Sequence, residues 1–110
     1  MNSVYPPLNI GIYGSEGRMG KDIISRARDF KEIEIAFLCE HPGHKSIGEK
    51  KDSLVVSNNV KELISYSDVI IDFTNSKGTL LLLNAIRKST YKPAVISGTT
   101  GYSRVEDKKY

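Results

Sequence analysis

The chain has 110 residues, of which 39% are hydrophobic and 26% charged, and its formal net charge is +3. This length supports one modest hydrophobic core, and the composition is typical of a soluble globular protein rather than a disordered, collagen-like or membrane-spanning one. Lysine and arginine are spread along the chain, which favours a solvated surface over a nucleic-acid-binding patch. The single Cys39 cannot form an internal disulfide and the first residues lack a secretory signal, so we expect a cytoplasmic protein.

The first half of the chain predicts two strands separated by a helix. Leu8–Tyr13 is short and apolar, follows two prolines and is typical of a buried parallel strand. Apolar residues recur at helical spacing over Arg18–Phe30, which predicts a helix. Ile33–Cys39 is rich in apolar and β-branched residues and predicts a second strand, with a turn at residues 40–43. Residues 44–53 are polar, and we expect an irregular segment there.

The second half continues with three more strands. Residues 54–56 and Val69–Phe73 predict the third and fourth strands, and Ala94–Ser97 the fifth. The intervening helices are predicted after an N-cap at Asn59 and over Lys77–Lys88. The second of these helices would be capped by Asn75 or Ser76, and a capping-box pattern at Ser103 and Glu106 predicts a further helix near residue 104.

Strands that alternate with helices predict a Rossmann-like α/β fold, a doubly wound parallel sheet of about five strands. Ligands of such sheets bind beyond the carboxyl ends of the strands, and the glycine-rich loop after the first strand lies there. Gly14, Gly17 and Gly20 would let backbone amides approach a pyrophosphate at a helix N-terminus, although such a turn can also serve packing alone. Gly11 falls within the predicted strand, and we expect it to serve packing.

Two further strand ends carry candidate binding residues. Glu40 follows the second strand, where an acidic side chain would accept hydrogen bonds from the adenosine ribose; the alternative is a surface carboxylate in a turn. Residues 98–101 read GTTG and offer backbone and hydroxyl hydrogen bonds to a nicotinamide or substrate; the alternative is an ordinary turn. Residues 72–74 end the fourth strand and would face the same crevice.

The remaining reactive residues indicate neither a metal site nor a catalytic centre. Cys39, Glu40, His41 and His44 match no known ligand spacing and lack a second ligand group, so we expect no metal. Tyr13 and Phe37 are expected in the core. The sequence contains no evident acid and base pair at the nicotinamide end, which predicts no catalytic residue in this chain.

Three motifs in this order, GSEGRMG, IDFTNSKGTL and GTTGY, closely resemble the N-terminal dinucleotide-binding domain of the 4-hydroxy-tetrahydrodipicolinate reductase family, from about Leu8 to Tyr102. The resemblance implies hydride transfer from NADH or NADPH to a cyclic dicarboxylate, giving tetrahydrodipicolinate in lysine and diaminopimelate biosynthesis. It implies pyrophosphate binding by the glycine loop, ribose binding by Glu40, a crevice lined by Phe73 and nicotinamide contacts from residues 98–100. The implied cofactor-binding residues are Gly14, Ser15, Glu16, Gly17, Arg18, Met19, Glu40, His41, Phe73, Gly98, Thr99 and Thr100.

Two residues depart from the family pattern. Many relatives carry an arginine directly after the ribose-binding acid, suited to the extra phosphate of NADPH, whereas this chain has His41. A histidine is mostly neutral at pH 7. Lys45 could compensate, so we expect NADH to be tolerated and leave NADPH open. Glu16 is also unusual, because a carboxylate near a pyrophosphate is repelled unless it turns outward to water.

The family's substrate domain, with its histidine- and lysine-containing catalytic motif and tetramer surfaces, follows the GTTG segment. The 110 residues do not contain it, so we expect residues 1–110 to be a dinucleotide-binding domain that is catalytically incomplete. Dicarboxylate binding would then require the missing domain, and neither nucleic acid nor membrane is expected as a partner. The alternative is a stand-alone module that senses a nucleotide or coenzyme A without chemistry.

Overall fold

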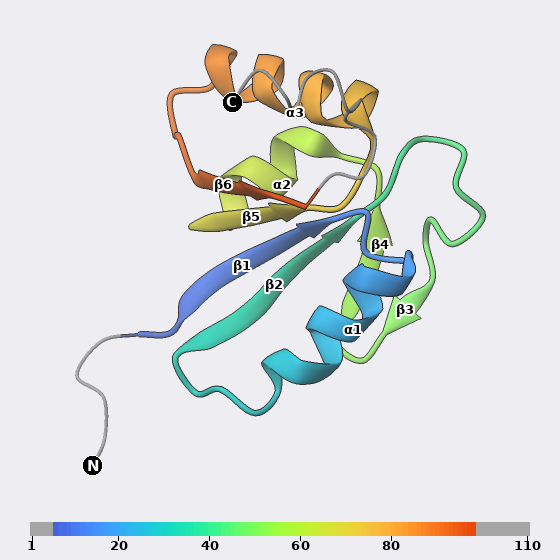
Figure 1. Cartoon of the computed structure of the whole chain (residues 1–110), viewed down its shortest axis with the longest axis vertical. Helices are drawn as coiled ribbons and strands as arrows, with labels where there is room; N and C mark the ends of the chain where they lie inside the picture. The colour runs from blue at the N-terminus through green and yellow to red at the C-terminus, as the bar shows by residue number, and fades with distance from the viewer. Residues whose placement is uncertain (1–5, 99–110) are drawn as a thin grey trace, which may run out of the picture.

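One sheet of six strands forms the centre of the molecule, in the order β3-β4-β2-β1-β5-β6 (Figure 1). The computed structural model describes residues 6–98. All neighbouring strands are parallel except β3, which pairs antiparallel with β4. The strands are β1 (Leu8–Tyr13), β2 (Ile33–Cys39), β3 (Lys50–Lys51), β4 (Leu54–Ser57), β5 (Val69–Asp72) and β6 (Ala94–Ser97).

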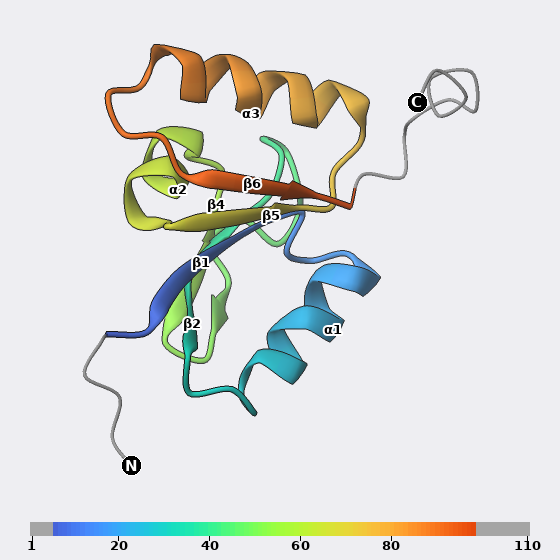
Figure 2. The same ribbon diagram turned by 60° about the vertical axis from the view of Figure 1, so that its left-hand side comes forward.

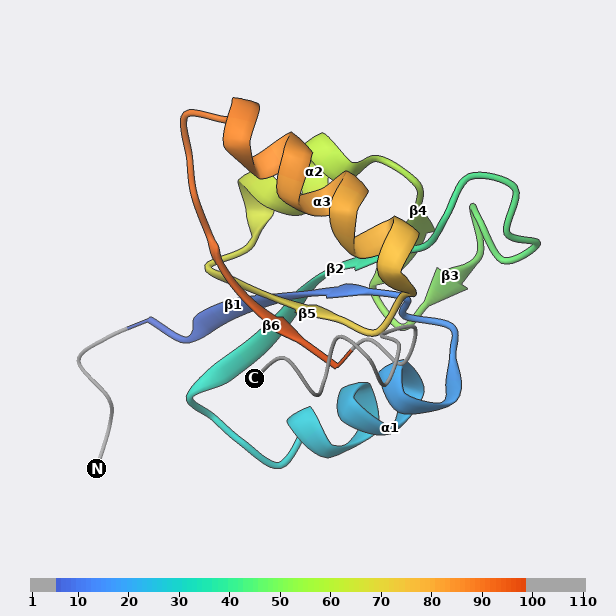
Figure 3. The same cartoon turned by 45° about the horizontal axis from the view of Figure 1, so that its top comes forward.

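Three helices cover the two faces of this sheet (Figures 2 and 3). Helix α1 (Arg18–Ala27) lies on one face, and α2 (Val60–Tyr66) and α3 (Ser76–Lys88) lie on the other. Within residues 6–98, no helix is both long and apolar enough to cross a membrane. Because side chains alternate along a strand, the sheet contributes to two apolar clusters, one on each face.

Strand β1 lies at the centre of the sheet, and successive strands are added first on one side of it and then on the other. From β1 the chain moves outward through β2 to β4, and then returns to add β5 and β6 on the other side of β1. This is the strand arrangement of the predicted doubly wound fold, and it leaves a crevice at the carboxyl ends of β1 and β5.

The predicted elements agree closely with the structure, with corrections at their ends. Asn59 caps α2 by accepting a hydrogen bond from the Glu62 amide, and Asn75 caps α3 in the same way from Gly78. Helix α1 ends at Ala27 and not at Phe30, because the chain turns there through hydrogen bonds of the i to i−3 type, and Phe30 is 57% exposed. The helix predicted near residue 104 lies outside the described residues.

The prediction of an irregular segment over residues 44–53 was wrong in its last part, where β3 forms a hairpin with β4. Lys50 pairs with Val55 and Lys51 with Leu54. Asp52 makes the turn with a φ of 56°, a conformation that aspartate tolerates better than most residues. Two consecutive lysines carry no apolar alternation, so the sequence gives little indication of a strand, although lysines are common on exposed edges.

Gly11 serves packing, as the sequence predicts. Helix α2 crosses β1 closely at this position. A Cβ atom on Gly11 would lie 2.1 Å from Ser67 Oγ and 2.6 Å from Leu63 Cδ1. Any larger residue would therefore push α2 away from the sheet.

Tyr13 and Cys39 are buried next to each other at the ends of β1 and β2. Burial, reinforced by the negative charges of Asp72 and Glu40, raises the pKa of Tyr13 to about 12. Burial beside Glu40 also raises the pKa of Cys39 to about 12. Both groups are therefore neutral near pH 7, and Cys39 is a core thiol and not a reactive one.

These raised pKa values predict that alkali destabilises the fold. Because the unfolded chain releases these protons at lower pH than the folded chain does, the free energy of unfolding should fall as pH rises from about 9 toward 12. Tyr13→Phe should reduce this loss by about 1 kcal/mol at pH 11. Urea unfolding of both proteins at pH 7.5 and 11 measures the difference, and equal losses in both would contradict the burial argument.

Candidate functional site

A cavity of about 640 Å³ lies at the carboxyl edge of the sheet, at the crevice between β1 and β5. Its walls come from the loop after β1, the turns after β2 and β5, and the first two turns of α3. The lining residues are Tyr13, Gly14, Gly17, Glu40, His41, Pro42, Phe73, Thr74, Asn75, Lys77, Gly78 and Leu81. Of the residues predicted to bind a cofactor, Gly14, Gly17, Glu40, His41 and Phe73 are thus brought together around one cavity.

The glycine loop is tightly folded between β1 and α1. Gly14 has a φ of 88°, which favours glycine, and its amide donates to the Cys39 carbonyl at 2.8 Å. Gly20 lies against the same loop, so a Cβ atom there would come within 2.5 Å of the Gly14 carbonyl oxygen. The close packing of α1 on the loop explains the third glycine of the motif.

The N-terminus of α1 is open to a ligand. Gly17 is its N-cap, no side chain caps the helix, and the first turn contains no acidic residue. The first amides of a helix have no intrahelical partner, and the helix dipole favours negative charge there. A Cβ atom on Gly17 would contact only the Gly14 oxygen, at 3.7 Å, so a small side chain would fit here without disturbing the packing. Because Gly17 lines the crevice, that side chain would instead block the approach of a ligand to the helix amides. The arrangement fits an anion such as a pyrophosphate.

Glu40 joins the glycine loop to the end of β2. It is only 6% exposed, and its Oε2 accepts a hydrogen bond from the Glu16 amide at 2.9 Å. Its Oε1 accepts one from the His41 amide at 3.3 Å. Because each carboxylate oxygen has two lone pairs, both oxygens can still accept a ribose hydroxyl from the crevice.

The Glu16 carboxylate does not turn outward to water. Its side chain is 4% exposed and lines a second cavity of about 650 Å³, between α1, β2 and the β3–β4 hairpin. The two cavities share no lining residue. The Glu16 carboxylate therefore turns away from the crevice and beneath the loop, where Lys51 approaches it.

Four other predicted residues, Ser15, Arg18, Met19 and Gly98, do not line the crevice. Ser15 is fully buried and donates to Glu16 Oε2, while Arg18 and Met19 are exposed at the start of α1. Gly98 lies against the Phe73 ring, since a Cβ atom there would come within 2.7 Å of Cε1. Thr99 and Thr100 lie outside the described residues.

The wall formed by residues 73 and 74 is held from below by a buried carboxylate. Asp72 is fully buried at the end of β5. It accepts hydrogen bonds from the Thr74 amide at 2.8 Å, the Thr74 hydroxyl at 2.6 Å and the Thr79 hydroxyl at 2.5 Å. These bonds fix the turn that presents Phe73 to the crevice and connect it to α3.

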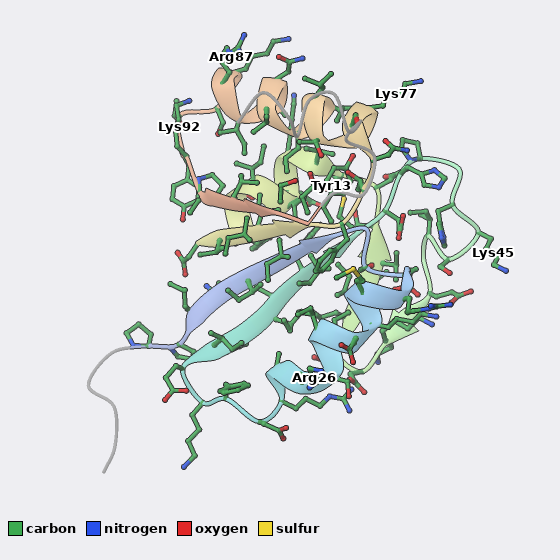
Figure 4. All side chains as sticks on the ribbon, viewed as in Figure 1. Tyr13, Arg26, Lys45, Lys77, Arg87 and Lys92 are labelled. Carbon is green, nitrogen blue, oxygen red and sulfur yellow. The ribbon has the colours of Figure 1, made fainter. Side chains whose placement is uncertain are left out.

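The sequence reasoning missed the contribution of α3 to the site. Asn75, Lys77, Gly78 and Leu81 line the crevice, and Lys77 adds a positive charge. Figure 4 shows Lys77 at the N-terminal end of α3 and Lys45 on the loop after β2, both on the side toward which the strands point. The strand order could have predicted this contribution. Because β1 and β5 are parallel neighbours, the helix after β5 begins at the same edge of the sheet as α1.

The fold also brings together Glu40, His41 and His44, whose possible ligand atoms lie within 4.8 Å of one another. The sequence predicts no metal here. Both imidazoles are engaged by backbone groups: His41 Nδ1 lies 3.1 Å from the Pro42 carbonyl oxygen, and His44 Nδ1 accepts from the Ser46 amide at 3.0 Å. Since a neutral ring that accepts at Nδ1 carries its proton on Nε2, His44 offers no free lone pair in this arrangement.

Comparison with known proteins agrees with this geometry. Among solved structures, the chain is similar to aspartate semialdehyde dehydrogenase II from Vibrio cholerae, described as complexed with ASA, with a TM-score of 0.58 and 15% identity. The similarity covers 86% of this chain and 31% of that one, and it shows the fold alone.

Curated relatives are more informative. The chain is 38% identical over 94 residues to 4-hydroxy-tetrahydrodipicolinate reductase from Campylobacter curvus, covering 86% of this chain and 35% of the relative. It is 34% identical over 112 residues to the same enzyme from the Wolbachia of Brugia malayi, covering 94% and 42%. The chain thus spans about two fifths of the length of these relatives. Residues 8–110 match the family described as dihydrodipicolinate reductase, N-terminus, and the chain belongs to that family.

Proposed function

We propose that residues 1–110 form the NAD(P)H-binding domain of a cytoplasmic 4-hydroxy-tetrahydrodipicolinate reductase. The observation that carries the proposal is the uncapped N-terminus of α1 opening onto the crevice beside Glu40. In the family's reaction, the bound reduced nicotinamide supplies a hydride to a cyclic dicarboxylate, which gives tetrahydrodipicolinate for lysine and diaminopimelate biosynthesis.

Each wall of the crevice has a distinct task in this proposal. The loop from Gly14 to Met19 wraps the pyrophosphate, which the free amides at the start of α1 bind, because the earlier loop amides already donate within the protein. Glu40 accepts hydrogen bonds from the adenosine ribose. Phe73 packs against the cofactor, and residues 98–100 contact its nicotinamide half. Lys77 at the mouth of the crevice adds favourable charge for the phosphates.

Catalysis requires more than this chain. The chain covers 35% and 42% of the two relatives above, and this proposal assigns the charged groups that line its crevice to the ribose and phosphates of the cofactor. We propose that dicarboxylate binding, proton transfer and tetramer formation belong to the part of those enzymes that this chain does not match. The chain by itself would then bind cofactor without turnover.

Cofactor preference depends on the residues around the adenosine ribose. His41 lines the crevice and replaces the arginine that, in the family pattern, is suited to the 2′-phosphate of NADPH. Lys45 and Lys77, both at the same edge of the sheet, are the candidates for a compensating charge. Neither lysine makes the bidentate contact of an arginine. We propose that NADH is bound, and a direct titration with both cofactors decides whether NADPH is bound as well.

Gly17→Ala tests the proposed pyrophosphate site. The added methyl group would occupy the approach to the α1 amides, so the affinity for NADH should fall about tenfold or more. The free energy of unfolding should fall by only about 1 kcal/mol, because the site has room for a Cβ atom. Fluorescence titration with NADH and NADPH measures binding. Unchanged affinity in the variant would place the dinucleotide elsewhere, and preferential binding of coenzyme A would favour a sensing module.

Glu40→Gln tests the ribose contact. The uncharged amide is a weaker acceptor, and it presents an amino group to one of the two backbone amides that Glu40 now binds. The affinity for NADH should fall roughly tenfold. Glu34→Gln is the matched control, since Glu34 is exposed on β2, the strand that precedes Glu40, and lines no part of the crevice. Equal affinities in the two variants would contradict the role of Glu40.

A further inference from the structure

Glu16 presents a physical problem for an anion-binding loop. Its backbone belongs to the glycine loop, and its side chain is buried directly beneath that loop with 4% exposure. Oε2 accepts a hydrogen bond from the Ser15 hydroxyl at 3.1 Å, but Oε1 is buried and has no hydrogen-bond partner. A buried carboxylate that lacks compensation is costly, and its negative charge would repel a pyrophosphate bound on the other side of the loop.

Lys51 is positioned to compensate for this charge. Its Nζ lies 3.6 Å from Glu16 Oε1 and 3.2 Å from Glu49 Oε1. The interactions with Glu49 and Glu16 raise the pKa of Lys51, so its ammonium group remains charged at neutral pH. Lys51 lines the cavity beneath the loop and no part of the crevice, so it would not contact a cofactor bound there.

The β3–β4 hairpin explains why a lysine reaches this place. Pairing of Lys51 with Leu54, next to the turn at Asp52, sets the hairpin strand alongside β4 and directs Lys51 toward α1. Lys50 is the neighbouring residue of the same strand and lines the same cavity, but it is more exposed. The hairpin thus offers two adjacent lysines, of which one forms the ion pair with Glu16.

We propose that Lys51 is a positioning residue for dinucleotide binding: it neutralises Glu16 beneath the glycine loop, so that the loop can accept a pyrophosphate. This proposal rests on the proposed function, because the ligand is the same dinucleotide. It assigns a role in cofactor affinity to a hairpin that lies outside the crevice.

A series of charge-removing substitutions in the full chain tests the proposal. Lys51→Met should weaken NADH binding roughly tenfold, because it leaves an uncompensated carboxylate near the pyrophosphate. Lys50→Met, the matched control, should change the affinity by less than about twofold. Adding Glu16→Gln to Lys51→Met should restore the affinity, because it removes the repelling charge. Thermal unfolding of each variant verifies that the proteins are folded.

The outcomes separate the two proposals. If the unaltered chain binds NADH and Lys51→Met binds equally well, the role of Lys51 is overturned while the proposed function stands. If the double variant stays as weak as Lys51→Met, Lys51 acts through packing and not charge, and the inference is again overturned. If the unaltered chain binds neither NADH nor NADPH, the proposed function fails and the inference fails with it.

Discussion

The candidate site depends on the attachment of the glycine loop to the end of β2. The Gly14 amide donates to the Cys39 carbonyl, and the Glu40 carboxylate accepts from the Glu16 amide. Together these bonds hold the loop between the two central strands, so that α1 begins at the crevice with its first amides free. Glu40 therefore shapes the loop and, in the proposed function, also binds the ribose. Its substitution would disturb two parts of one site.

On the opposite wall of the crevice, a second buried carboxylate accepts hydrogen bonds from the residues that follow a strand and fixes their conformation. Asp72 holds the turn through residues 73 and 74 and reaches α3 through Thr79. Both carboxylates are anchored by donors from neighbouring segments, which limits the reorganisation needed when a ligand binds. The crevice thus suits a dinucleotide with little rearrangement, and in the proposed function the chemistry of substrate reduction belongs to parts of the relatives that this chain does not match.

Much of this arrangement could be predicted from local sequence patterns. Apolar stretches located β1, β2 and β6, asparagine caps located the starts of α2 and α3, and glycine spacing located the loop. The hairpin at Lys50–Lys51 could not be predicted, because two consecutive lysines carry no apolar alternation, although the strands it joins are neighbours in sequence. The inward turn of Glu16 could not be predicted, because it depends on a contact with Lys51, far along the chain. The same holds for Lys77, whose place at the crevice follows from strand order and not from its neighbours in sequence.

The most direct test of the central claim is to map NADH binding by amide chemical shifts of the ¹⁵N-labelled chain. Binding at the crevice predicts concentration-dependent shifts of the Gly14 and Gly17 amides and of the first turn of α1. The amides of Ser25 and Leu54, which line the other cavity, should change little. Shifts confined to that second cavity, or no shifts at millimolar NADH, would contradict the account.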